Sequence, residues 1–359
     1  MGQIRAALCR AFGEPFVIET VELADPLGRE VEVTLEACAI CHSDITYASG
    51  AWGGALPAVY GHEAAGRVSG LGPDTKGYQI GDRVIVTLIR SCGTCPECSK
   101  SAPTICSDAA ATAPLTTDAG EPVFQAMNCG AFAEKVVVDP SQIAPIPDEI
   151  AMDAASLLSC GVITGVGAVI NAAGLRPGED AVVIGAGGVG LNAIQGAKLA
   201  GARRIVAVDM LERKLDDARA FGATDGILAN AKAPWDDLRA MTGRGADAVF
   251  VTVGAAAIYD TAPRYLAPGG RVVMVGMPPS GQTSTFAPDI LASLGQSLVG
   301  TKMGDTVLDR DIPWLADLYL QGRLKLDELI SNRWPLDQIN EAIADTKAGQ
   351  ARRNVIVFD

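Results

Sequence analysis

The pattern of hydrophobic and polar positions changes near residue 160, and this change predicts two different kinds of structure along the chain. Before that point, short runs rich in Val, Ile and Thr are separated by Gly, Pro and Asp, which is typical of short strands joined by irregular loops. We therefore expect a compact β domain, partly open or barrel-like. The runs are residues 30–40, 66–72, 83–88 and 133–138.

From about residue 160, strand-like runs alternate with helical patterns, which predicts βαβ units and a parallel sheet covered on both faces. After residue 302, two amphipathic helical patterns, 311–324 and 335–349, precede a final strand. The predicted fold class is therefore α/β. We expect a first domain over residues 1–160, completed by 303–359, and a doubly wound parallel-sheet domain over residues 161–302.

Charge and hydrophobicity limit the partners that this chain can have. Its 359 residues carry a formal net charge of −13, which argues against bulk electrostatic binding to nucleic acid or to an anionic membrane surface. Residues 154–175 carry no charge and are long enough to span a bilayer, but glycines and polar residues interrupt them, which favours a buried helix packed against a sheet. The first residues contain no apolar run before a cleavage site, so we expect a cytoplasmic protein without membrane partners.

Four closely spaced cysteines form the strongest chemical pattern in the sequence. Cys92, Cys95, Cys98 and Cys106 make a C-x2-C-x2-C-x7-C run in a loop rich in Gly, Pro, Ser and Thr. Four thiolates can surround one tetrahedral ion, so the run predicts a structural zinc site that replaces the core this loop lacks. The alternative is a set of disulfides, but the total of nine cysteines is odd, which suits a reduced protein better.

A glycine pattern predicts a dinucleotide site. Gly185, Gly187 and Gly190 form G-x-G-x-x-G directly after a strand-like run and at the start of a helical pattern. Such glycines allow a tight turn, a close approach of backbone to a pyrophosphate, and close packing of helix on strand. A second strand-like run ends in Asp209, whose carboxylate would accept hydrogen bonds from a ribose and repel a 2′-phosphate, so we expect NAD rather than NADP. The same aspartate could also cap the following helix.

A second set of metal-ligating residue types is dispersed along the chain. Cys41, Asp44, His62, Glu63 and Cys160 could supply it, and Cys and His are ligands that zinc prefers. Three protein ligands would leave one position open for water or substrate. Sequence distance alone does not bring these residues together, and Cys160 taken by itself favours a buried core residue over a metal ligand.

Several motifs in a fixed order resemble one family. They are CHSD (41–44), GHE (61–63), the four-cysteine loop (92–106), SCG (159–161) and GAGGVG (185–190). The chain is similar, nearly from end to end, to the zinc-dependent alcohol dehydrogenases of the medium-chain dehydrogenase/reductase family. The resemblance implies a GroES-like β domain joined to a Rossmann domain, an NAD-dependent enzyme with two zinc ions per chain, a small alcohol or aldehyde as substrate, and a homo-oligomer, dimer or tetramer.

The resemblance also implies roles for individual residues. Cys41, His62 and Cys160 would hold a catalytic zinc, with Glu63 as an occasional ligand, Asp44 orienting His62, and Ser43 receiving the alcohol proton. Two residues, Trp52 and Leu88, would line the substrate pocket. The remaining implied contacts are with the cofactor: His42, Thr164, Gly185, Gly187, Gly188, Val189, Gly190, Asp209, Lys214 and Arg353.

One position departs from the family pattern and bears on the mechanism. Many relatives carry a histidine five residues after the first zinc cysteine, whereas this chain has Thr46 there, so its proton relay must end differently. Ala51, Trp52 and Gly53 occupy positions that are charged in the glutathione-dependent formaldehyde dehydrogenases. We therefore expect apolar primary alcohols, aromatic or medium-chain, as substrates. The alternatives are oxidation of a thiol adduct of formaldehyde, and a zinc-stabilised NAD-binding protein without turnover.

Overall fold

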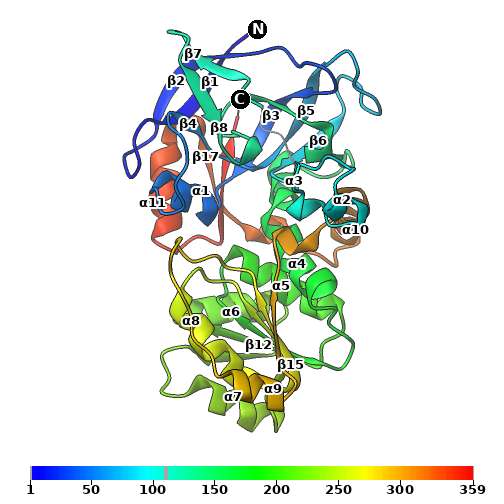
Figure 1. Cartoon of the computed structure of the whole chain (residues 1–359), viewed down its shortest axis with the longest axis vertical. Helices are drawn as coiled ribbons and strands as arrows, with labels where there is room; N and C mark the ends of the chain where they lie inside the picture. Colours follow the sequence, from blue (N-terminus) through cyan, green and yellow to red (C-terminus); the bar gives the residue numbers. More distant parts are fainter. Residues whose placement is uncertain (1, 109–111, 359) are drawn as a thin grey trace. The chain divides into compact units, whose positions relative to one another are not determined.

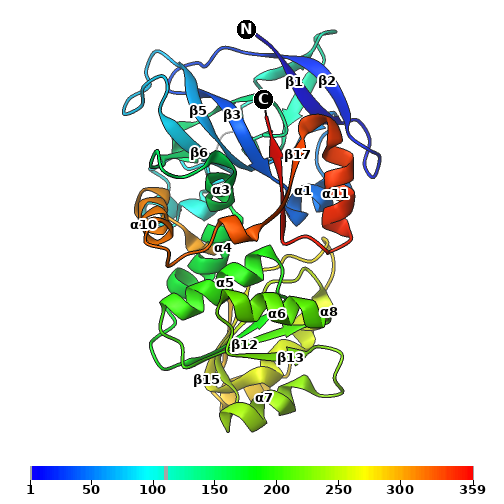
Figure 2. The ribbon, with the colours of Figure 1, turned by 180° about the vertical axis from the view of Figure 1, so that it is seen from behind.

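The computed structural model describes residues 2–108 and 112–358, and the chain divides into two compact units. Unit 1 comprises Met1–Cys160 and Val307–Asp359, and unit 2 comprises Gly161–Thr306. In Figures 1 and 2 the first part of unit 1 is coloured from blue through cyan to green and its last part from orange to red, and unit 2 is coloured from green through yellow to orange. Unit 1 is mainly β-structure, and unit 2 alternates strands with helices.

The strands of unit 1 form a closed barrel and a larger sheet. The barrel runs β1-β2-β7-β8-β4, and the sheet runs β10-β6-β5-β3-β18-β17, with β9 paired to β3. The strands are β1 (Gly2–Cys9), β2 (Val17–Leu23), β3 (Val31–Ala39), β4 (Ala58–Val59), β5 (Glu63–Leu71), β6 (Arg83–Thr87), β7 (Leu115–Thr117), β8 (Pro122–Gln125), β9 (Lys135–Val138), β10 (Ile143–Pro145), β17 (Ile330–Pro335) and β18 (Arg353–Val357).

The alternation along β3 explains how this sheet buries one face. Val31, Val33 and Leu35 are buried while the residues between them are partly exposed, which is the period of two that a half-buried strand requires. Large side chains such as Tyr60 and Phe132 fill the core beneath. Full burial of each such side chain contributes roughly 1.5 to 3 kcal/mol to stability.

Unit 2 is a doubly wound parallel sheet. Its strand order is β13-β12-β11-β14-β15-β16. Successive strands are added on one side of β11 as far as β13 and then on its other side from β14 onward, which creates a topological switch point at the carboxyl ends of β11 and β14. Helices α5 and α6 lie in front of this sheet in Figure 2. The strands are β11 (Asp180–Ile184), β12 (Arg204–Asp209), β13 (Asp225–Leu228), β14 (Ala246–Val251), β15 (Leu266–Met274) and β16 (Ser297–Gly300).

The helices of both units are short. Those of unit 1 are α1 (His42–Ala48), α2 (Pro96–Ser99), α3 (Met152–Ser156), α10 (Leu308–Leu320) and α11 (Ile339–Lys347), and those of unit 2 are α4 (Gly161–Gly167), α5 (Gly188–Leu199), α6 (Glu212–Phe221), α7 (Pro234–Thr242), α8 (Ala256–Thr261) and α9 (Pro288–Ser293). The two amphipathic patterns after residue 302 correspond to α10 and α11. The strand β17 between them was not predicted.

The uncharged stretch 154–175 is buried as far as residue 169, but it is not the single helix that the sequence predicted. It is broken at Cys160, whose φ of −150° and ψ of −67° are not helical. Among residues 2–108 and 112–358, no single helix is long and apolar enough to cross a membrane, and the pair Met152–Ser159 and Gly161–Ala172 meets that test only when its two bent parts are counted together.

Candidate metal centres and dinucleotide site

The structure brings four of the dispersed residues of unit 1 into one buried cluster. One ligand atom from each of Cys41, His62, Glu63 and Cys160 lies within 4.8 Å of the others. Cys41 lies between β3 and α1, and the pair His62–Glu63 lies at the start of β5. Cys160 lies between α3 and α4. The β3–β5 pairing, which sets Ala39 opposite Glu63, thus juxtaposes segments that lie about twenty residues apart in the sequence.

Asp44 fixes the geometry of this cluster through three hydrogen bonds. Its Oδ2 accepts from the Cys41 backbone N–H at 3.0 Å, and its Oδ1 accepts from the Gly61 N–H at 2.9 Å and pairs with His62 Nδ1 at 3.0 Å. The carboxylate is fully buried, so these bonds compensate the cost of removing its charge from water. With Nδ1 held by Asp44, the Nε2 lone pair of His62 faces the cluster.

The cluster has the donor set of a zinc site. His62 Nε2 is buried and has no hydrogen-bond partner among the described residues, and two thiols lie beside it. The contact with Cys160 lowers the pKa of Cys41 well below its usual value. The same contact, together with burial, raises the pKa of Cys160 well above it. Two thiols whose contact favours the thiolate form of Cys41, together with one imidazole nitrogen that has no hydrogen-bond partner among the described residues, fit a divalent cation.

A buried ion pair supports the cluster from one side. Arg353 of β18 binds Glu63 through its guanidinium and also donates to the Ile40 carbonyl at 3.4 Å. Burial raises the pKa of Glu63 to about 7, against the lowering effect of Arg353. Glu63 Oε1 has no partner among the described residues, so one oxygen of this carboxylate remains available to the cluster. The resemblance implied Glu63 as an occasional zinc ligand and Arg353 as a cofactor contact, but not their pairing, because 290 positions separate them.

The other residues of unit 1 that the resemblance assigned to the site lie near the Cys41–His62–Cys160 cluster, on α1, or against the hydrophobic core. Cys41 Sγ lies 3.7 Å from Ser43 Oγ. Thr46 donates its hydroxyl to the His42 carbonyl at 2.8 Å, so it is engaged within α1. The His42 side chain is exposed. Trp52 packs edge-to-face on Tyr47, with ring centroids 4.9 Å apart, and Leu88 is partly buried against the core of unit 1.

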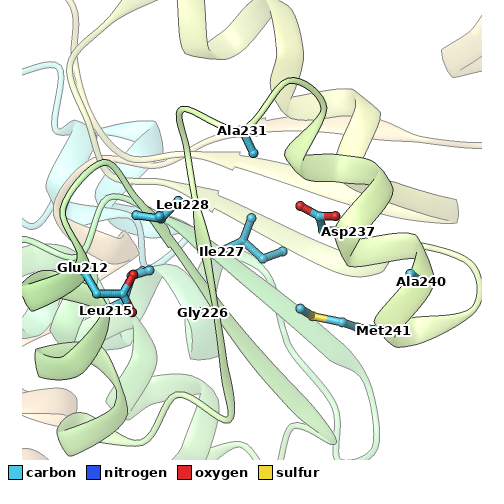
Figure 3. A pocket seen from close by; sticks show the side chains of 9 residues that line it. All are labelled: Glu212, Leu215, Gly226, Ile227, Leu228, Ala231, Asp237, Ala240 and Met241. Atoms are coloured by element: carbon cyan, nitrogen blue, oxygen red, sulfur yellow. The ribbon is translucent and has the colours of Figure 1, made fainter.

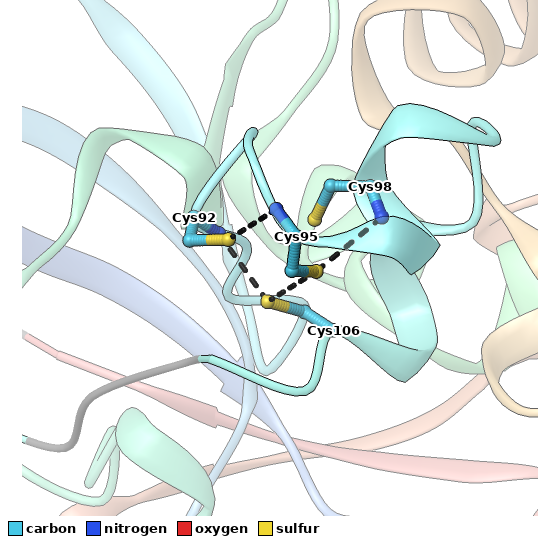
Figure 4. Close-up of side chains that lie close together, drawn as sticks. All are labelled: Cys92, Cys95, Cys98 and Cys106. Atoms are coloured by element: carbon cyan, nitrogen blue, oxygen red, sulfur yellow. Dashed lines mark hydrogen bonds between the residues drawn. The ribbon is translucent and has the colours of Figure 1, made fainter.

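The four loop cysteines form a second cluster, and their side chains point toward one another (Figure 4). Their Sγ atoms all lie within 4.8 Å of one another, with Cys95 and Cys106 3.8 Å apart. The structure describes all nine cysteines and joins none of them in a disulfide, so it does not contain the disulfides of the alternative interpretation. Backbone N–H groups of Thr94 and Cys95 lower the pKa of Cys92 to about 6, which favours the thiolate that a metal requires.

In unit 2, the three glycines of the predicted dinucleotide motif occupy different environments. Gly185 adopts a φ of +96°, which other residues rarely reach. A Cβ on Gly190 would lie 1.8 Å from the Gly185 carbonyl oxygen, so helix α5 and strand β11 approach too closely for a side chain. A Cβ on Gly187 would meet nothing within 4 Å. The turn is thus crowded on the protein side and open at its middle glycine, which fits a pyrophosphate resting against backbone.

Asp209 lies at the end of β12 and contacts the same turn. Its Oδ2 accepts from the Ala186 N–H at 2.8 Å, and its Oδ1 accepts from the Leu211 N–H at 3.2 Å. The interpretation of Asp209 as the N-cap of the next helix is wrong, because α6 begins at Glu212 and Leu211 is its N-cap residue. Among the other predicted cofactor residues, Gly188 and Val189 open α5, and Lys214 lies partly exposed on α6. Thr164 is buried in α4.

A surface hollow of about 530 Å³ lies in unit 2 beside the edge strand β13. Figure 3 shows its lining residues, which come from α6, β13, α7 and the connection between β13 and α7. They are Glu212, Leu215, Gly226, Ile227, Leu228, Ala231, Asp237, Ala240 and Met241. None of the residues predicted for the zinc or dinucleotide sites lines this hollow.

Comparison with known proteins decides the family. The family model of the alcohol dehydrogenase GroES-like domain matches residues 28–148, and that of the zinc-binding dehydrogenase domain matches residues 188–321. Alcohol dehydrogenase B of Mycobacterium tuberculosis is 34% identical over 368 residues, which cover 99% of this chain and 98% of that protein. The chain belongs to the zinc-dependent alcohol dehydrogenases.

Solved structures of such dehydrogenases have the same fold as this chain. An alcohol dehydrogenase zinc-binding domain protein from Burkholderia ambifaria is 33% identical with a TM-score of 0.95, over 100% of this chain and 99% of that one. Benzyl alcohol dehydrogenase from Acinetobacter calcoaceticus is 29% identical with a TM-score of 0.94, over the full length of both chains.

Membership in the zinc-dependent alcohol dehydrogenases confirms several predictions from the sequence. The chain combines a GroES-like domain with a Rossmann-type domain, and it is an oxidoreductase that depends on zinc and acts on a small alcohol or aldehyde.

Proposed function

We propose that this alcohol dehydrogenase oxidises apolar primary alcohols, aromatic or medium-chain, with NAD as hydride acceptor and with two zinc ions per chain. The observation that carries the proposal is the buried cluster of Cys41, His62 and Cys160, oriented by Asp44, in a chain whose other unit contains a dinucleotide turn. The similarity to benzyl alcohol dehydrogenase supports an aromatic substrate. The partly buried Trp52 and Leu88 would supply apolar contact area for it.

Each group of the cluster has a distinct role in this proposal. Cys41, His62 and Cys160 would hold a zinc ion, which would supply the Lewis acidity that polarises a substrate hydroxyl and lowers its pKa. Ser43 lies beside Cys41 and would accept the hydroxyl proton. Asp44 holds His62 in the tautomer that leaves Nε2 free as a ligand, and Arg353 holds one oxygen of Glu63. Since Thr46 donates to a backbone carbonyl, we expect the proton to leave through water and a ribose hydroxyl of the cofactor rather than through this side chain.

The experiment that tests the substrate class is a screen of NADH formation with benzyl, hexyl and short branched alcohols, and with formaldehyde in the presence and absence of several thiols. We expect the highest kcat/KM with the apolar primary alcohols and no requirement for a thiol. Activity that appears only when formaldehyde is combined with a thiol would replace this proposal with the thiol-adduct reaction.

Asp209 would select NAD over NADP. Its carboxylate lies at the end of β12 and contacts the glycine turn, where a 2′-phosphate would meet a like charge. Asp209→Ser should weaken NAD use and reduce the discrimination against NADP. An unchanged ratio of kcat/KM for the two cofactors would contradict this role.

We also propose a reducing, cytoplasmic location, which cysteines without disulfides and thiolate metal sites favour.

We further propose a homo-oligomer that uses an apolar surface of unit 2. Residues 277–300 contain a single charged residue, Asp289, and end in β16, the edge strand of the sheet. Four large apolar side chains of this segment are exposed by 40 to 61%, and such a surface with a free strand edge fits a second copy of the chain. They are Met277, Phe286, Ile290 and Leu294.

Light scattering of the purified protein tests the oligomer, with Ile290→Glu as the perturbation. We expect a dimer or tetramer that dissociates in this variant, because a charge would enter the apolar surface. The exposed Leu27 of unit 1 provides the control, since Leu27→Glu should leave the assembly intact. A wild-type monomer, or an assembly that both variants retain, would contradict the proposal.

A further inference from the structure

Thr252 contacts the dinucleotide turn from a segment of the chain that the glycine motif does not include. It follows β14 (Ala246–Val251), so it lies beside the turn at the topological switch point of the sheet. Its Oγ1 lies 2.8 Å from the Gly185 carbonyl oxygen and 3.0 Å from the Ile184 carbonyl oxygen. The hydroxyl therefore donates to the first residue of the turn.

The contacts of Thr252 and Asp209 fall on the same peptide group. The carbonyl of Gly185 accepts from Thr252 Oγ1, and the N–H of Ala186, on the other end of that peptide bond, donates to Asp209 Oδ2 at 2.8 Å. A rotation of this peptide plane would break both hydrogen bonds at once. One side chain directly after β14 and one at the end of β12 thus fix the orientation of this peptide group from its two ends.

The space around the hydroxyl is closely filled. A Cβ on Gly185 would lie 2.9 Å from Thr252 Oγ1, and a Cβ on Gly190 would lie 3.1 Å from it. The Thr252 hydroxyl therefore occupies the crowded side of the turn, where the first and third glycines are required. The open side, at Gly187, is left for the ligand.

We infer that Thr252 is a positioning residue of the pyrophosphate-binding turn. Its hydroxyl holds the Gly185–Ala186 peptide in the orientation that presents the N–H groups at the start of α5 to the cofactor phosphates. This inference rests on the proposed use of NAD. It adds a side chain to the site that lies outside both the glycine motif and the carboxylate at the end of β12.

Two substitutions separate the hydroxyl from the methyl group of Thr252. Thr252→Val keeps the shape and removes the donor, whereas Thr252→Ser keeps the donor and removes the methyl group. The matched control is Thr261→Val, because Thr261 Oγ1 also donates to a backbone carbonyl of unit 2, that of Ile258 at 3.1 Å, but lies in α8 rather than at the turn.

The measurement is the dissociation constant of NAD, ADP and adenosine by calorimetry, together with Tm and zinc content. Loss of one hydrogen bond should weaken NAD and ADP binding of Thr252→Val by roughly 3- to 10-fold. Adenosine has no phosphate, so its affinity should stay within about twofold of wild type. Thr252→Ser and Thr261→Val should bind all three ligands like wild type.

Several outcomes would overturn the inference. Unchanged NAD affinity in folded Thr252→Val would do so, as would an equal loss for adenosine and ADP, which would indicate a general destabilisation of the unit. If Thr252→Val does not fold, the comparison moves to Thr252→Ala against Thr252→Ser, and equal NAD affinities in these two would refute the role of the hydroxyl. If the wild-type protein does not bind NAD, the proposed use of NAD is refuted together with the role of Thr252. If the wild-type protein binds NAD and Thr252→Val binds it equally well, only the role of Thr252 is refuted.

Discussion

Replacing Asp44 with asparagine should loosen the catalytic zinc without removing a single zinc ligand. Asp44 is fully buried and accepts three hydrogen bonds, from the backbone N–H groups of Cys41 and Gly61 and from His62. Asparagine has the same shape, but only one of its two terminal atoms can accept. If that oxygen accepts from Gly61 and His62, the NH2 group of the asparagine faces the Cys41 N–H. Both groups are donors, so the hydrogen bond to the Cys41 N–H is lost.

The magnitude follows from these contacts. The variant loses one hydrogen bond to a charged acceptor and leaves one buried donor without a partner, which together should lower the free energy of unfolding by about 2 to 4 kcal/mol. Loss of the carboxylate partner of a ligating histidine typically costs about 10- to 100-fold in metal affinity or activity. We therefore expect Asp44→Asn to release one zinc ion at chelator concentrations about 10- to 100-fold lower than wild type.

The assay is a titration with a chromogenic chelator, followed by the zinc that remains per chain and by turnover. Asp139→Asn is the matched control, because Asp139 is also a buried carboxylate of unit 1 that accepts a backbone N–H and an arginine, but it is not part of either cysteine cluster. The control should lose stability and keep its zinc. Equal chelator sensitivity of Asp44→Asn and wild type would refute the reasoning that this carboxylate positions the ligand set.

Three further predictions concern other parts of the molecule. Cys106→Ser should remove one zinc ion per chain and lower Tm, since its loop has little core of its own, and retention of both ions by elemental analysis would contradict the structural site. Burial raises the pKa of Asp139, but the hydrogen bonds that it accepts, from Arg29 above all, outweigh burial and lower its pKa. The wild-type protein should therefore be more stable than Asp139→Asn by about 1 to 2 kcal/mol at neutral pH. Denaturant titrations should show this stability difference shrinking below about pH 4, where the carboxylate becomes protonated. Gly190→Ala should abolish NAD binding or unfold unit 2, because its Cβ would lie 1.8 Å from a backbone oxygen, and a variant with wild-type NAD affinity by calorimetry would disprove this close approach.

The parts of the site that the sequence predicted are those encoded by closely spaced residues. The four-cysteine run places its ligands within one loop, and the glycine motif lies within one strand–turn–helix segment. Their local spacing is enough to specify the chemistry. The alternation of strands and helices likewise predicted the parallel sheet, because strands buried on both faces, such as β11, form continuous apolar runs.

The parts that the sequence did not predict depend on contacts between distant segments. The Arg353–Glu63 pair and the Thr252–Gly185 bond join residues 290 and 67 positions apart, and no local pattern reports them. The convergence of Cys41, His62 and Cys160 came only from resemblance to a family, since it depends on the β3–β5 register. The sequence did not predict the helix break at Cys160, because the uncharged run around it contains no signal that ends a helix at that position.

The most direct test of the central claim is the turnover of Cys41→Ala with benzyl alcohol and NAD, measured with zinc content and the dissociation constant of NAD. Cys9→Ala is the control, because Cys9 is equally buried but belongs to neither cluster. We predict that wild type and Cys9→Ala form NADH and hold two zinc ions per chain. Cys41→Ala should lose one zinc ion and its turnover while NAD affinity stays unchanged, since the dinucleotide turn lies in the other unit. Wild-type turnover in Cys41→Ala would contradict the zinc-dependent mechanism proposed for this cluster.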